Sequence, residues 1–151
     1  MAIVAYAGTD TRGLVGGHAD SQEWNARTRL ADNVAVATIG PGQPVIRLAG
    51  NDVVCRGGWA SGATLGLVRA AIDLDTTTGA VEGQRLAIQT IGTMWVAAGA
   101  AATAGVNAGY NPATDRWANV AGSYVSVPGV EFDTTGVSGG LVRVRIAIPA
   151  A

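Results

Sequence analysis

Glycine, proline, asparagine and aspartate divide the sequence into short apolar segments, and this spacing limits what the chain can fold into. The segments expected to be strands cover residues 34–39, 44–48, 53–56, 64–74, 84–96, 124–127, 131–132 and 141–148. Turn signals that recur about every 8–12 residues are typical of antiparallel sandwiches and barrels. A doubly wound fold would need long helical crossovers, and we find no amphipathic stretch that could supply them. We therefore predict an all-β fold, either an antiparallel, jelly-roll-like β-sandwich or a small β-barrel.

The clearest strand pattern is at the end of the chain. In residues 141–148 two arginines alternate with apolar side chains, so that Val142, Val144, Ile146 and Ile148 share one face, opposite Arg143 and Arg145. A period of two over this length indicates a half-buried strand. Residues 84–89 repeat the pattern, which predicts Leu86 and Ile88 inside and Gln89 outside.

Two stretches are expected to be turns or loops. A turn at Pro128-Gly129 would separate the segments 124–127 and 131–132. The alanine-rich residues 97–104 could suggest a helix, but Gly99 interrupts them, so we expect a loop.

The first 32 residues differ from the rest because glycine and polar residues dominate them. We divide the chain into an N-terminal arm, residues 1–32, and a β-domain, residues 33–151. Asp20 and Glu23 could cap a short helix over residues 22–30. The arm is either a frayed terminus or a segment that becomes ordered against a neighbour. For the second case we predict Trp24, Leu30 and Tyr6 as the side chains that bind the partner, because apolar anchors commonly carry such contacts.

Composition excludes several classes of protein. The net charge is −1 and there is no basic excess, so nucleic acid is not an expected partner. The chain has no lysine, which rules out a Schiff-base or phosphate-loop lysine. No apolar run reaches about 18 residues, and the Met-Ala-Ile start lacks a positively charged segment. We therefore expect neither a membrane span nor secretion, and we expect synthesis in a cytoplasm.

Two motifs resemble catalytic sequences. Residues 136–140, Gly-Val-Ser-Gly-Gly, match a nucleophile elbow around Ser138, but that motif needs a following helix and a later histidine, whereas the single histidine is His18. Residues 73–77 match the Asp-x-Asp-x-Thr of dehalogenase-type phosphotransferases, which also need a cationic side chain, normally lysine, against the phosphoryl group. We interpret both as turns.

Metal and cofactor sites are not expected either. The chain has one cysteine, Cys55, and one histidine, so it cannot build a structural zinc site. We predict no catalytic residues, no metal site, no cofactor and no enzymatic activity.

Three segments share a pattern of glycine followed by strand-forming residues. Residues 92–96 are Gly-Thr-Met-Trp-Val, residues 104–111 run from Ala-Gly-Val to Tyr-Asn, and residues 140–146 form the start of the closing strand. With these segments the chain resembles the cement or decoration proteins of tailed bacteriophage capsids over residues 33–150.

That resemblance implies a non-enzymatic virion protein, made in the host bacterial cytoplasm, that binds the outer capsid surface. It would cement neighbouring major capsid proteins as a homo-oligomer, a dimer or trimer on a capsid symmetry axis, without contacting nucleic acid or membrane. Two alternatives stay open. One is another phage virion β-domain, from a tail or head fibre. The other is a carbohydrate-binding module that uses Trp59, Trp95 and Trp117 as a sugar platform.

Overall fold

A computed structural model describes residues 15–17, 25–32, 39–48, 53–55, 64–71, 74 and 79–148. These residues contain nine strands and no helix, which confirms the all-β prediction. The strands are β1 (Asn25–Ala31), β2 (Pro44–Arg47), β3 (Val53–Cys55), β4 (Thr64–Val68), β5 (Arg85–Ala97), β6 (Asn107–Asn111), β7 (Arg116–Asn119), β8 (Val125–Phe132) and β9 (Leu141–Ala147). In this part of the chain no helix is long and apolar enough to span a membrane.

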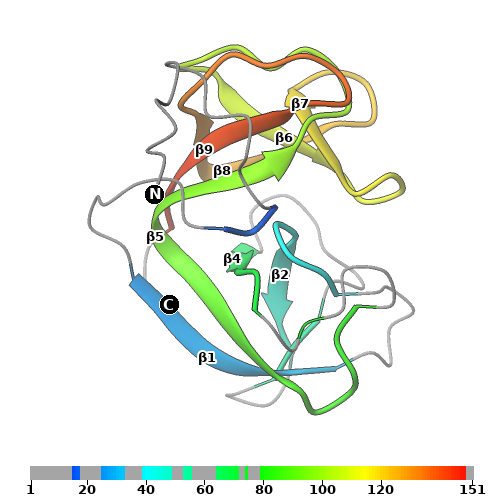
Figure 1. The fold of residues 1–151 in the computed structure, drawn as a ribbon, viewed down its shortest axis with the longest axis vertical. Coiled ribbons are helices and arrows are strands. Elements are labelled where there is room, and N and C mark those ends of the chain that lie inside the picture. The colour runs from blue at the N-terminus through cyan, green and yellow to red at the C-terminus, as the bar shows by residue number, and fades with distance from the viewer. Residues whose placement is uncertain are drawn as a thin grey trace, which may run out of the picture.

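Five strands close into a small barrel, which we call the lower barrel after its place in Figure 1. Its order is β1-β3-β2-β4-β5, and β1 pairs again with β5 to complete the ring. The pairing of β1 with β3 is parallel, and the other pairings are antiparallel. Of the two predicted architectures, the structure therefore has the small barrel. Its core includes Val45, Val54, Leu86 and Ile88.

The remaining strands continue the same sheet from the second half of β5 in the order β9, β8, β6 and β7. The sheet curls back on itself, because Ala98 forms a bridge with Trp117 of β7 and the Gly99 amide donates to the Trp117 carbonyl at 2.8 Å. We call this half the upper barrel (Figure 1). Its core includes Met94, Tyr110, Trp117, Phe132 and Val144.

Strand β5 belongs to both barrels. It is 13 residues long, about twice the usual strand length. Its first half pairs with β1 and β4, and its second half pairs with β9 from Ile91 to Ala97. Gly92 lies where the partners change and has φ of 119°, a conformation that other residues rarely adopt. This glycine lets one strand pass from the lower to the upper barrel.

Short backbone segments fill the junction between the barrels. The Gly16 amide donates to the Trp95 carbonyl at 2.8 Å, and the Gly16 carbonyl accepts from the Ala70 amide at 2.8 Å. From the upper core, the Trp117 indole donates to the Gly42 carbonyl at 3.0 Å. These contacts tie both barrels to one set of turns.

The structure corrects the expectations for residues 15–32. The helix predicted over residues 22–30 is wrong for the described residues, because Asn25–Ala31 is a strand that pairs with β5 over six residue pairs. The part of the expected arm that the structure describes therefore lies within the lower barrel and its junction. Residues 1–14 and 18–24 lie outside the described residues, and for them the arm stays a prediction.

Four details of the strand prediction also change. Strand β8 runs through Pro128-Gly129 without a turn, because these residues form a bulge in which Gly129 has φ of 82°. Strand β4 ends at Val68, earlier than expected. Strand β6 was not predicted. Gln89, expected outside, is fully buried and donates through Nε2 to the Thr93 carbonyl at 3.2 Å. The segment 34–38 lies outside the described residues.

Candidate interaction surfaces

Ser138 lies in a turn that leads into strand β9, as predicted, and not in a strand-to-helix elbow. Its hydroxyl donates to the Gly99 carbonyl at 2.9 Å, and the neighbouring Gly139 amide donates to the Ala98 carbonyl at 2.9 Å. The serine therefore joins two loops of the upper barrel. His18, its only conceivable imidazole base, lies outside the described residues.

The other residues considered for catalysis or metal binding are placed only in part. Asp73 and Asp75 lie outside the described residues, as does the side chain of Cys55. Among the described residues, no three His, Cys, Asp or Glu side chains lie close enough together to hold a metal ion.

The tryptophans occupy different environments from those expected. Trp117 is 1% exposed and packs on Tyr110 with ring centroids 5.1 Å apart. A buried ring cannot form a sugar platform, so the platform of three tryptophans is wrong. Trp95, which a strand position would favour as core, is half-buried on the outer face of β5, opposite Arg143 of β9. Trp59 lies outside the described residues.

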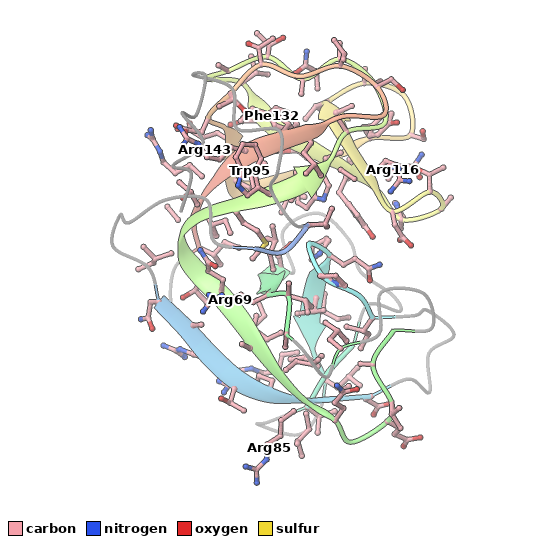
Figure 2. The ribbon with its side chains drawn as sticks, in the orientation of Figure 1. Arg69, Arg85, Trp95, Arg116, Phe132 and Arg143 are labelled. Carbon is pink, nitrogen blue, oxygen red and sulfur yellow. The ribbon has the colours of Figure 1, made fainter. Side chains whose placement is uncertain are left out.

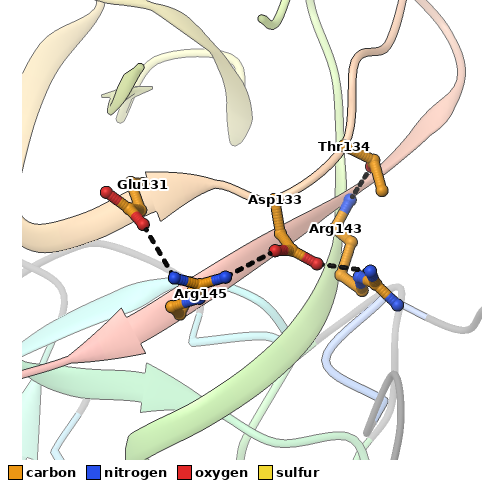
Figure 3. Close-up of polar contacts among 5 residues, drawn as sticks. All are labelled: Glu131, Asp133, Thr134, Arg143 and Arg145. Carbon is orange, nitrogen blue, oxygen red and sulfur yellow. Dashed lines mark hydrogen bonds and ion pairs between the residues drawn. The ribbon is translucent and has the colours of Figure 1, made fainter. Parts of the chain in front are cut away.

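An ion-pair ladder crosses the outer face of β8 and β9 (Figure 3). Arg145 contacts Glu131 at 3.3 Å and Asp133 at 3.0 Å, and Arg143 pairs with the second carboxylate oxygen of Asp133. The Thr134 hydroxyl accepts from the Arg143 amide at 3.0 Å. The two arginines and the two carboxylates neutralise one another, so this face offers little free charge to a ligand.

A different surface follows β1 and the first half of β5 in the lower barrel. Thr28, Arg29, Leu30 and Arg85 line a shallow hollow of about 300 Å³. Leu30 lies directly opposite Arg85 and is half-buried. Figure 2 shows the Arg85 side chain pointing away from the bottom of the lower barrel. Within the described part of the chain, Arg85 has no ion-pair partner. We call this surface the β1–β5 surface.

A third surface closes one end of the upper barrel, at the top of Figure 1. Three segments form it, residues 98–106, 118–124 and 134–140, and none of them contains Asp, Glu, Lys or Arg. We call it the uncharged end. Residues 98–106 are hydrogen-bonded to both of the other segments. Ala102 and Gly136 exchange backbone hydrogen bonds of 2.9 and 3.1 Å, and the Asn119 amide donates to the Ala101 carbonyl at 2.9 Å.

Side chains reinforce this framework. The Asn119 amide nitrogen donates to the Thr103 hydroxyl at 3.0 Å, and the Asn119 side-chain oxygen accepts from the Thr103 amide at 2.9 Å. Arg116 stands at the rim, because a Cβ built on Gly99 would lie 2.6 Å from its Cβ.

Apolar side chains project from the uncharged end. Val137 is 72% exposed, Val120 47% and Val106 39%. On the same end, Ala100, Ala101 and Tyr124 line an open, largely apolar hollow. Half of the six large apolar side chains that are exposed in the described residues lie here. A gathering of this kind is typical of surfaces that contact other proteins.

The residues predicted to bind a partner are only partly placed. Leu30 lies on the β1–β5 surface, whereas Trp24 and Tyr6 lie outside the described residues. The three valines of the uncharged end were not predicted. The signal available in the sequence was the absence of charge from residues 98–106, 118–124 and 134–140, but nothing in the sequence shows that these segments meet.

Comparisons with known proteins are consistent with this architecture. Residues 4–147 match the family model described as "Structural cement protein (E217 gp24/Pam3 gp6)". A chain in the structure titled "The capsid of Myoviridae Phage XM1" is similar, with a TM-score of 0.68 and 15% identity over 97% of this chain and 98% of that chain. That likeness shows a shared fold.

A weaker likeness joins the chain to the base of the head fibre gp8.5 of bacteriophage phi29. The TM-score is 0.43 and the identity 15%, over 83% of this chain and 95% of that chain, and we draw nothing from it. No curated protein matches the sequence.

Proposed function

We propose a specific mode of action for this chain, which belongs to the family of phage structural cement proteins. As a member it is a non-enzymatic structural component of a phage capsid, and it binds capsid proteins. Our proposal is that it binds the outer surface of the shell where neighbouring major capsid proteins meet, and that it holds them together. The observation that carries the proposal is the family match, which spans residues 4–147.

The architecture supports a bridging role. Two barrels share strand β5 and are joined by the Trp117–Gly42 hydrogen bond, so a contact at one end is rigidly connected to a contact at the other. Rigid partners lose little conformational freedom on binding. A shell offers many equivalent sites, and linked contacts that are individually weak gain strength through avidity.

We place the attachment to the shell on the β1–β5 surface together with the arm. Leu30 supplies an apolar contact beside the exposed guanidinium of Arg85. Trp24 and Tyr6 would add aromatic anchors from the arm, since aromatic side chains and arginine are enriched in the energetic centres of interfaces. We also propose that the protein acts as a dimer or trimer on a capsid symmetry axis.

The test uses phage particles stripped of this protein. We expect the purified wild-type protein to rebind in a fixed ratio to the major capsid protein and to raise the temperature at which the particles release their DNA. Leu30→Ala, Trp24→Ala and removal of residues 1–14 should each lower occupancy at a given concentration. Val125→Ala is the control, because Val125 is also apolar and 40% exposed but lies outside the proposed contact.

Two results would count against the proposal. Failure of the wild-type protein to rebind, with its fold verified by circular dichroism, would exclude outer-surface binding. Equal occupancy for the wild-type protein and all three variants would exclude the β1–β5 surface and the arm as the attachment site.

A further inference from the structure

We propose that the uncharged end is the surface through which copies of this chain contact one another. The inference rests on the oligomer proposed above and assigns it a location. The site comprises residues 98–106, 118–124 and 134–140, with Val137, Val120 and Val106 as its projecting apolar side chains.

The first argument is electrostatic. Across a rotation axis, only residues close to the axis lie near their own copies, so a charged side chain there meets a like charge. Like charges brought together in an interface cost several kcal/mol. A self-contact therefore favours a surface without charges, whereas a contact with a different protein can match each charge with its opposite. The uncharged end fits the first case, because no residue in its three segments is ionised.

The other described surfaces fit a self-contact less well. The β1–β5 surface carries the exposed guanidinium of Arg85, which would meet its own copy if it lay close to an axis. The face of β8 and β9 carries the ladder of Arg143, Arg145, Asp133 and Glu131, whose charges already satisfy one another. Of the surfaces described, only the uncharged end is formed by segments without an ionised residue, with Arg116 at its rim.

The second argument concerns the cost of ordering. The uncharged end consists mostly of Ala, Gly, Ser, Thr and Val, side chains that lose little rotamer freedom on burial. Its backbone is already held by the Ala102–Gly136 and Ala101–Asn119 hydrogen bonds. A preorganised surface loses less freedom on association, so more of the free energy from burying the valines becomes affinity.

The third argument is geometric. The uncharged end lies at the top of the upper barrel, and Arg85 of the β1–β5 surface points away from the bottom of the lower barrel (Figure 2). A molecule that binds the shell through one end and its copies through the other can satisfy both contacts at once.

The experiment measures self-association by sedimentation equilibrium of the full chain, without capsid. We compare the wild-type protein with Val137→Asp and Val120→Asp. Val81→Asp is a matched control, since Val81 is 71% exposed against 72% for Val137 but lies in the turn before β5. Thermal melting of each variant verifies the fold, and exposed positions should leave it unchanged.

We expect a discrete wild-type oligomer, with a dissociation constant raised by about tenfold or more in Val137→Asp and Val120→Asp because each places like charges at the contact. Val81→Asp should associate as the wild type does. A monomeric wild-type protein at every concentration would overturn the inference, as would unchanged association of both variants or equal dissociation of the control.

Particle binding separates this inference from the function proposed above. A wild-type protein that rebinds stripped particles but never self-associates would remove the inference and leave the cement function standing. Variants that stay oligomeric but no longer rebind would also overturn it, because the uncharged end would then contact the shell.

Discussion

The Trp117 indole Nε1 donates a hydrogen bond of 3.0 Å to the Gly42 carbonyl, 75 residues away, and so joins the core of the upper barrel to a turn of the lower barrel. Both residues are buried. Trp117→Phe keeps most of the ring but removes the donor. We expect the free energy of unfolding to fall by about 1–3 kcal/mol, because the buried carbonyl loses its partner. Urea unfolding measures the change.

The control for that substitution is Trp95→Phe. Trp95 is half-buried, and the described part of the chain shows no hydrogen bond from its indole. Trp95→Phe should therefore lower the free energy of unfolding clearly less than Trp117→Phe does. Equal losses would indicate that ring volume, and not the hydrogen bond to Gly42, explains the effect.

Gly16 should tolerate no side chain. Its φ is +75°, and a Cβ would lie 2.6 Å from the Pro41 Cβ and 2.7 Å from the Ala70 backbone nitrogen. Gly83 has nearly the same φ, +78°, but nothing lies within 4 Å of a Cβ there. We expect Gly83→Ala to cost about 1–2 kcal/mol for the left-handed backbone alone. Gly16→Ala should cost several kcal/mol more in thermal unfolding, and similar melting temperatures would show that the junction is loosely packed.

The two carboxylates of the ion-pair ladder should contribute unequally to the free energy of unfolding. Asp133 pairs with both Arg143 and Arg145 and its side chain is 14% exposed, whereas Glu131 is 43% exposed and pairs with Arg145 alone. Glu131→Gln should change stability by less than about 1 kcal/mol, as expected for an exposed pair. Asp133→Asn should lower the free energy of unfolding by more than Glu131→Gln does, because it leaves two arginines without that carboxylate. Urea unfolding at low and high salt checks both, and a larger loss for Glu131→Gln would contradict the ranking.

Strand β1 should be needed for folding. It pairs with both β3 and β5, so its removal would open the lower barrel and expose Leu86 and Ile88. We expect a chain lacking residues 1–14 to keep its β-type circular dichroism and cooperative melting. A chain lacking residues 1–31 should lose cooperative melting. A stable protein without β1 would show that the β-domain begins after residue 32, as the sequence suggested.

The sequence by itself determined the strands whose pattern is local. Alternation in residues 141–148 places Val142, Val144 and Ile146 in the core and the arginines outside, because side chains of successive strand residues point to opposite faces. The Gly-Pro-Gly break at residues 40–42 and the loop after Ala97 follow from turn chemistry in the same way. From these local signals the all-β class could be predicted, as could the turn at Ser138.

Only the tertiary structure decided which strands form a ring. Asn25–Ala31 has polar and charged residues where a core strand would have apolar ones, and it is a strand because β3 and β5 supply its hydrogen-bond partners. Gln89 is buried, although the alternation within β5 would place it outside. The uncharged end has the same origin. Its three segments lack charge in the sequence, but the pairings of Ala102 with Gly136 and of Ala98 with Trp117 bring them together. Contacts between residues far apart in the chain depend on the whole fold, and this is why they leave no local pattern.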